Sequence, residues 1–112
     1  MNSRNDPLSA AIAPGSPVVA YLHSPREKLW GILGGVDLAG VYLRAIDLNT
    51  FDDWIQTIAR GERNIALTRM FLPMWRVERI ILDESVDEIP SMADKFFSRV
   101  GMTVEQYLEL ES

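Results

Sequence analysis

The sequence contains no cysteine and a single histidine, His23, and both features exclude kinds of site. Without cysteine the chain forms no disulfide and offers no thiolate for zinc or iron and no thiol nucleophile. Sites built on two or three histidines are excluded as well. No stretch approaches the roughly 20 apolar residues of a membrane span, and the start lacks the charged-then-apolar order of a signal peptide. We therefore expect a cytoplasmic protein with no membrane association.

The length of 112 residues corresponds to one domain, and the net charge of −5 is spread unevenly along it. Residues 17–82 carry eight basic residues against seven acids, whereas residues 83–112 carry two against eight. The overall sign argues against strong nonspecific binding of nucleic acid. Five arginines between residues 60 and 79 nevertheless leave room for a local basic patch.

Residues 1–16 are small, polar and interrupted by prolines, which predicts a flexible lead-in. Three strands are then predicted over 18–22, 28–36 and 41–48, because these segments are rich in β-branched and aromatic residues. The second strand contains Gly31, Gly34 and Gly35. Glycines inside a strand mark a sharp bend or a bulge, which a small barrel needs in order to close.

A short helix is predicted over residues 50–60, where apolar residues from Phe51 to Ile58 recur at helical spacing. Thr50 is expected to cap its start and Gly61 to end it. Residues 64–72 and 76–83 return to strand-like composition. The link between these two strands is too short for the crossover that parallel strands require, so we predict a mainly antiparallel sheet.

Residues 84–112 are predicted to form an acidic extension with two short helices. The first begins at Ser91 and ends at Gly101, and the second has a capping box of Thr103 with Gln106. Apolar side chains in this extension need a surface to cover, so we expect it to dock on the strand domain of residues 17–83. The expected docking residues are Phe96, Val100 and Leu108.

The strand region, residues 17–83, resembles the Sm-like family of small β-barrels. The run Gly31-x-Leu33-x-x-Val36-Asp37 carries the resemblance, preceded by an alternating apolar strand and followed by Val41-x-Leu43. Sm-like proteins vary in length between their third and fourth strands, which is where this chain has its extra helix. The resemblance implies a mainly β fold, namely a five-stranded antiparallel Sm- or SH3-like barrel in which Gly31 and Asp37 organise the bend and its loop.

The resemblance also implies a function. Sm-like barrels pair their edge strands into ring-like homo-oligomers and bind single-stranded RNA, so we expect a non-catalytic, self-associating binding or scaffold module. An arginine set with an aromatic side chain for stacking would contact the RNA. The candidate RNA-binding residues are Arg44, Arg69, Arg76 and Arg79.

Trp75 is the most informative single residue, because it lies in the tight link before the last strand. Tryptophan, methionine and arginine are enriched at protein interfaces. The interface candidates are Trp75, Met74 and Phe71. Trp75 alternatively plugs one end of the barrel or packs under a C-terminal helix.

A protein-interaction domain with no nucleic-acid role is the second hypothesis. It is favoured by the negative net charge and by two departures from the family: Val41 stands at the spacing of the base-binding asparagine, and Leu72-Pro73 replaces an arginine-glycine pair. A small enzyme with a metal or carboxylate centre is the third. His23 lacks a partner in the sequence that would make it a general base, and the acidic groups lack the spacing of a calcium loop. We therefore expect no catalytic residue, no metal and no cofactor.

Overall fold

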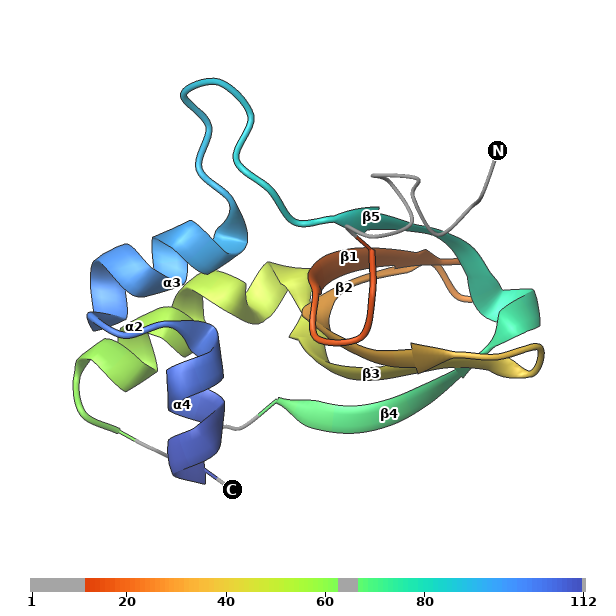
Figure 1. Ribbon diagram of the computed structural model, residues 1–112, viewed down its shortest axis with the longest axis horizontal. Helices are drawn as coiled ribbons and strands as arrows, with labels where there is room; N and C mark the ends of the chain where they lie inside the picture. Colours follow the sequence, from red (N-terminus) through yellow and green to blue (C-terminus); the bar gives the residue numbers. More distant parts are fainter. Residues whose placement is uncertain (1–11, 63–66, 112) are drawn as a thin grey trace. The chain divides into compact units, whose positions relative to one another are not determined.

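The computed structural model describes residues 12–62 and 67–111, which form two compact units (Figure 1). One unit holds the strands, in residues 12–48 and 67–82, and the other holds the helices, in residues 49–62 and 83–111. The sequence assigned the helix near residues 50–60 to the strand domain. Its contacts place it with the C-terminal helices instead, because its apolar side chains pack against theirs.

Five strands are described, and they form one open antiparallel sheet. Their bounds are β1 Pro17–Leu22, β2 Glu27–Val36, β3 Gly40–Asp47, β4 Thr68–Pro73 and β5 Val77–Leu82. The order across the sheet is β4-β3-β2-β1-β5, so β4 and β5 are its two edges (Figure 1). The antiparallel pairing predicted from the short connections is confirmed. Closure of this sheet into a barrel stays a prediction.

The glycines of β2 fit two different local constraints. The register between β2 and β3 shifts between Leu33 and Gly35, so Gly34 is the extra residue of a bulge, as the sequence predicted. At Gly31 the neighbouring strand approaches closely: a Cβ there would lie 2.0 Å from the carbonyl oxygen of Arg44. Gly31 therefore allows β3 to pack directly against β2.

The core of the strand unit lies on one face of the sheet, because residues alternate between the two faces along each strand. Partly buried side chains of β4 and β5 pack against it. The buried core residues are Val18, Ala20, Leu22, Leu29, Leu33, Val41, Leu43, Ala45 and Leu72.

Short connections join the strands. A turn over residues 23–26, with a cis peptide bond before Pro25, joins β1 to β2. A single 3-10 turn, η3 (Met74–Arg76), joins β4 to β5. The fourth strand was expected over residues 64–72, but residues 64–66 lie outside the described residues and β4 begins at Thr68.

The helical unit contains α2 (Phe51–Ala59), α3 (Met92–Val100) and α4 (Val104–Glu111). The ends of α3 agree with the sequence, since the Ser91 hydroxyl accepts the Asp94 amide and Gly101 adopts a left-handed conformation. The capping box of α4 is confirmed as well, with reciprocal bonds between Thr103 and Gln106. The prediction for Thr50 is wrong: its side chain makes no cap bond, because the 3-10 turn η2 (Leu48–Thr50) runs straight into α2.

An aromatic cluster forms the core of the helical unit. Trp54 of α2 lies 5.1 Å from Phe96 of α3 and 6.0 Å from Tyr107 of α4, measured between ring centroids. Phe96 and Tyr107 are themselves 5.7 Å apart. The sequence predicted that Phe96 contacts the strands. In the structure its ring packs against those of Trp54 and Tyr107. Docking of the extension on the sheet stays a prediction.

The predicted lead-in, residues 1–16, lies outside the described residues up to residue 11. Its last residues join the sheet: the Gly15 amide donates to the Leu33 carbonyl oxygen at 2.7 Å, and the Leu33 amide donates to Ser16 at 2.9 Å. Within the described parts of the chain, no helix is long and apolar enough to cross a membrane.

Candidate nucleic-acid interface

Two pairs of side chains stand opposite each other on β3 and β4. In the antiparallel register, Arg44 faces Arg69 and Tyr42 faces Phe71. The two pairs are two residues apart along each strand, so all four side chains share the face of the sheet opposite the apolar core. The rings of Tyr42 and Phe71 are tilted by 52° with their centroids 5.1 Å apart, an arrangement typical of interacting aromatic side chains.

These side chains border a surface groove of about 390 Å³, which we call the arginine–aromatic groove. The bulge at Gly34 contributes to it. A Cβ on Gly34 would lie 3.2 Å from the Tyr42 carbonyl oxygen, so a larger residue would crowd this part of the groove. The lining residues are Gly34, Tyr42, Leu43, Arg44, Arg69, Met70 and Phe71.

The two arginines of the groove, Arg44 and Arg69, have no carboxylate partner within the described parts of the chain, residues 12–62 and 67–111. The Nε of Arg44 is buried and has no hydrogen-bond partner among those residues. Like charges directly opposite each other destabilise a strand pair, and buried donors are normally satisfied. An anion in the groove would offset the repulsion between the two guanidinium groups.

Arg76 is not part of this groove. Its guanidinium forms a 2.8 Å ion pair with Glu27 and donates to the carbonyl oxygens of Pro25, at 2.9 Å, and His23, at 3.3 Å. These bonds fasten η3 to the turn between β1 and β2. Arg76 is therefore a structural residue, and its donors are directed at the protein itself.

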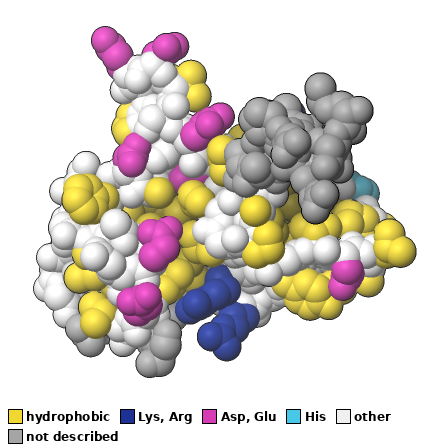
Figure 2. Space-filling model, viewed as in Figure 1, with side chains coloured by type: hydrophobic (Ala, Val, Ile, Leu, Met, Phe, Trp, Pro, Cys, Tyr) yellow, Lys and Arg dark blue, Asp and Glu magenta, His cyan; other side chains and the backbone are white. Residues whose placement is uncertain are grey.

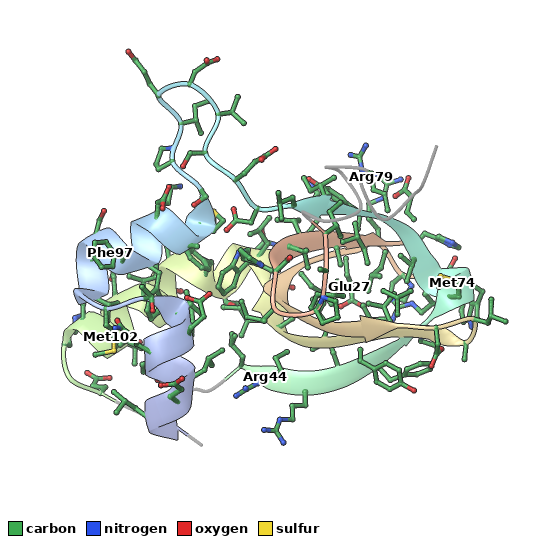
Figure 3. The ribbon with its side chains drawn as sticks, in the orientation of Figure 1. Glu27, Arg44, Met74, Arg79, Phe97 and Met102 are labelled. Atoms are coloured by element: carbon green, nitrogen blue, oxygen red, sulfur yellow. The ribbon has the colours of Figure 1, made fainter. Side chains whose placement is uncertain are left out.

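Arg79 lies elsewhere on the sheet, as Figure 3 shows by comparison with Arg44. Its guanidinium sits 4.4 Å from the centroid of the Tyr21 ring, which the Lys28 ammonium also approaches, at 5.6 Å. The three residues form one row across β2, β1 and β5. The four arginines predicted to bind RNA thus separate into the Arg44–Arg69 pair, Arg79 beside Tyr21, and the structural Arg76.

The residues predicted for a protein interface are exposed. Trp75 is 64 % exposed in η3, and its ring centroid lies 6.3 Å from that of His23 in an edge-to-face arrangement. Met74 beside it is 38 % exposed. Met74 lies at the end of the sheet near the turn between β2 and β3 (Figure 3), and its amide donates to Ala39 at 2.9 Å. Phe71 belongs to the groove instead.

Asp37 holds the turn between β2 and β3. Its carboxylate accepts the amide of Ala39 at 2.8 Å and that of Gly40 at 3.1 Å. These bonds fix the conformation of a turn whose tip carries the exposed side chain of Leu38.

Among the described residues, no three histidine, aspartate or glutamate side chains gather as metal ligands would. The Nδ1 of His23 is hydrogen bonded to the neighbouring Ser24 hydroxyl at 3.0 Å. At the start of α3, hydrogen bonds from Ser85 and then Ser91 lower the pKa of Asp94. These bonds are explained by helix capping.

Sequence reasoning named Arg44, Arg69 and Phe71 but missed Tyr42 and the groove itself. The signal is present in the sequence as Tyr42-x-Arg44 on one strand and Arg69-x-Phe71 on the other, because residues two apart share a face. To predict that these two pairs lie side by side, one must know the register of β3 against β4. That register cannot be derived from either segment alone.

Comparison with known proteins adds no relative. No protein-family model matches the chain, and no curated protein and no solved structure matches it either.

Proposed function

We propose that this chain is a non-catalytic, Sm-like β-barrel module that self-associates and binds single-stranded RNA in the arginine–aromatic groove. The observation that carries the proposal is the pairing of Arg44 with Arg69 directly beside the pairing of Tyr42 with Phe71. Single-stranded RNA presents the two chemistries that match these pairs, namely phosphates and unstacked bases.

Each pair has a distinct role in this proposal. The guanidinium groups hold a phosphate, for which arginine is suited because its planar fork donates two parallel hydrogen bonds. The exposed ring of Phe71, with Tyr42 beside it, offers a stacking surface for a base. Gly34 leaves space for the base, since it adds no side chain to the groove.

Two features support the barrel and its self-association. Strands β1 to β4 follow one another as a meander and β5 returns to pair with β1, with a bulge in β2 and a single 3-10 turn between β4 and β5. Its edge strands, β4 and β5, carry the exposed apolar side chains of Phe71 and Ile81. Edge strands are open to pairing with another chain. Pairing β4 of one copy with β5 of the next would satisfy the backbone groups of both edge strands.

Binding is tested with a fluorescent single-stranded oligoribonucleotide of mixed sequence. We expect the intact protein to bind at low salt and to weaken steeply as salt rises, because phosphate contacts release counterions. The double variant Arg44→Ala/Arg69→Ala should lose at least about tenfold in affinity and show a shallower salt dependence. The matched control Arg60→Ala removes an exposed arginine at the end of α2. It should leave the RNA affinity and its salt dependence unchanged. Equal affinities for all three proteins, or no binding at low salt, would overturn the RNA proposal.

Self-association is tested by light scattering on the eluting protein, with its absorbance ratio recorded. A discrete mass equal to several chains supports an Sm-like ring. A monomer at all concentrations would contradict association through β4 and β5.

A protein-interaction role is the second candidate, and one observation favours it. Trp75 and Met74 are exposed on η3, and the hydrogen bond from the Met74 amide to Ala39 ties η3 to the turn that carries Leu38. A fixed apolar surface of this kind is typical of an interface. Trp75→Ala should then weaken capture of a protein partner while leaving RNA affinity and thermal stability unchanged. A large loss of thermal stability would show that Trp75 supports the fold instead.

A further inference from the structure

A small hairpin stands between β5 and α3 and exposes two aliphatic side chains. The amide of Val86 donates to the Ile89 carbonyl oxygen at 3.0 Å, and the Ile89 amide returns the bond at 2.9 Å. In such a mutually bonded antiparallel pair the two side chains lie on the same side. Val86 is 56 % exposed and Ile89 is 70 % exposed. Together with Glu84, Asp87 and Glu88 they form what we call the acidic hairpin, residues 84–89.

The acidic hairpin is held firmly at its base. Before it, the Asp83 carboxylate accepts the amides of Met92 and Ala93 at 2.8 and 2.9 Å, and so bonds to the first turn of α3. Ser85 hydrogen bonds to Asp94, and its hydroxyl accepts the Ser91 amide at 3.1 Å. Figure 2 shows acidic and hydrophobic side chains together on this projecting loop. A held segment loses little conformational entropy on binding, so the hairpin is organised in advance as a binding element.

The arginine–aromatic groove is complementary to the acidic hairpin. Its two arginines lack a carboxylate partner among the described residues, and the hairpin offers carboxylates at its turn. The apolar part of the groove, from Tyr42, Met70 and Phe71, matches the exposed aliphatic pair. The net charges of the two units are also opposite in sign. The described strand unit carries six basic and four acidic residues, and the described helical unit three basic and eleven acidic.

A second basic surface exists but fits less well. Lys95 and Arg99 of α3 border another hollow, of about 260 Å³, whose lining includes the carboxylate of Asp52. The arginine–aromatic groove has no acidic residue in its described lining. An acidic ligand therefore meets no repulsion from the lining of the arginine–aromatic groove.

We propose that the acidic hairpin of one copy of this chain docks into the arginine–aromatic groove of a second copy. Asp87 and Glu88 pair with Arg44 and Arg69, while Val86 and Ile89 cover the aromatic side chains. The contact joins different surfaces of the two copies, so it links chains head to tail. It uses the same groove as the proposed RNA function but does not depend on RNA binding, and the two ligands exclude each other.

Isotope-mixed cross-linking of the full chain tests this contact. Arg44→Lys keeps the positive charge and supplies an amine that a zero-length carbodiimide joins directly to a carboxylate. Equal amounts of unlabelled and ¹⁵N-labelled Arg44→Lys protein are mixed and cross-linked at low salt, and the products are identified by mass spectrometry. We expect position 44 to be joined to Asp87 or Glu88 in pairs that contain one light and one heavy chain.

Two further variants show which groups hold the contact. Adding Val86→Ser and Ile89→Ser to the Arg44→Lys protein should lower the cross-link yield roughly fivefold, since aliphatic burial is lost. Adding Asp52→Asn to the same protein removes a carboxylate outside the hairpin and should leave the yield unchanged. Circular dichroism of each variant checks that it is folded.

Three results would overturn the inference: links only within one chain, hairpin carboxylates joined to Lys95 in place of position 44, or no link from position 44. RNA binding is measured separately on the unmodified protein. Cross-links without RNA binding would therefore remove only the RNA proposal, and RNA binding without cross-links would remove only this inference.

Discussion

Arg44 and Arg69 stand directly opposite each other on β3 and β4, and neither has an ion-pair partner among the described residues. Cross-strand pairs of like charge destabilise a sheet by about 0.2–1 kcal/mol. The fold tolerates this cost at the place where Tyr42 and Phe71 offer an exposed aromatic surface. A local cost of this kind is typical of a binding site, where function is favoured over stability.

The first prediction concerns this pair. Arg69→Glu replaces the repulsion with an attraction, so it should raise the free energy of unfolding by about 0.5–1 kcal/mol. Arg69→Gln removes only the repulsion and should give a smaller gain. Urea denaturation measures both. The same variants should bind RNA more weakly than the intact protein, and a loss of stability in Arg69→Glu would contradict this account of the groove.

The second prediction compares two glycines of β2. A Cβ at Gly31 would lie 2.0 Å from the Arg44 carbonyl oxygen and 2.6 Å from Ala45, so Gly31→Ala should force the strands apart and cost about 3 kcal/mol. Gly35 has nothing within 4 Å of the same position, and Gly35→Ala should change stability by less than about 0.5 kcal/mol. Thermal denaturation distinguishes them. Equal effects would show that β2 and β3 are less close than described.

The elements that sequence reasoning found were those with strong local signals. Alternating apolar residues indicated the strands, the glycines indicated the bulge, and the cap residues Ser91 and Thr103 indicated the start of α3 and α4. Thr50 was misread because a 3-10 turn precedes α2, and a turn of that kind leaves no signal distinct from the helix itself. The contacts of Phe96 with Trp54 and Tyr107 were not foreseen, because an aromatic residue on a helix does not indicate which side chains it packs against.

The candidate site was predicted only in part for a related reason. The arginines could be named from their number and position, but their grouping depends on register and on local partners. Arg76 is close in sequence to the groove residues, yet its donors are used by Glu27 and by backbone oxygens 49 or more residues earlier in the chain. Contacts between such distant residues are a property of the fold.

The third prediction tests the assignment of Arg76 as structural. Arg76→Ala removes three hydrogen bonds, one of them an ion pair, and should lower the free energy of unfolding by about 1–2 kcal/mol. Arg76→Lys should recover only a small part, because a single ammonium cannot reach acceptors that lie in different directions. Chemical denaturation measures the loss. RNA affinity should stay unchanged. A large drop in RNA affinity with an intact fold would show that Arg76 contributes to RNA binding after all.

The fourth prediction concerns the base of the acidic hairpin. The Ser85 hydroxyl donates to the Asp94 carboxylate and, as the largest cause, lowers its pKa below the ordinary value of 3.8. The ionised carboxylate thus stabilises the fold above that value, and its contribution disappears as the pH falls through the lowered pKa. In Ser85→Ala the pKa should rise, and the stability difference from the intact protein should be larger at neutral pH than in acid.

Carboxyl-detected NMR titration of Asp94 measures this shift. Thr57→Ala, a change on α2 where the hydroxyl donates to the Asp53 carbonyl oxygen, serves as the control and should leave the pKa of Asp94 in place. A part of the stability loss in Ser85→Ala should persist at low pH, because the bond from the Ser91 amide to Ser85 is lost at every pH. An unchanged pKa in Ser85→Ala would show that this hydroxyl does not hold the carboxylate.

The proposed RNA site is tested most directly by ultraviolet cross-linking of the full chain to oligouridine, followed by mass spectrometry of the peptides. Uridine stacked in the arginine–aromatic groove should attach to Phe71 or Tyr42, and the adduct should disappear in Arg44→Glu/Arg69→Glu protein that remains folded. Adducts confined to Trp75 or to Tyr21, or no adduct at low salt, would contradict the assignment of this groove as the RNA-binding surface.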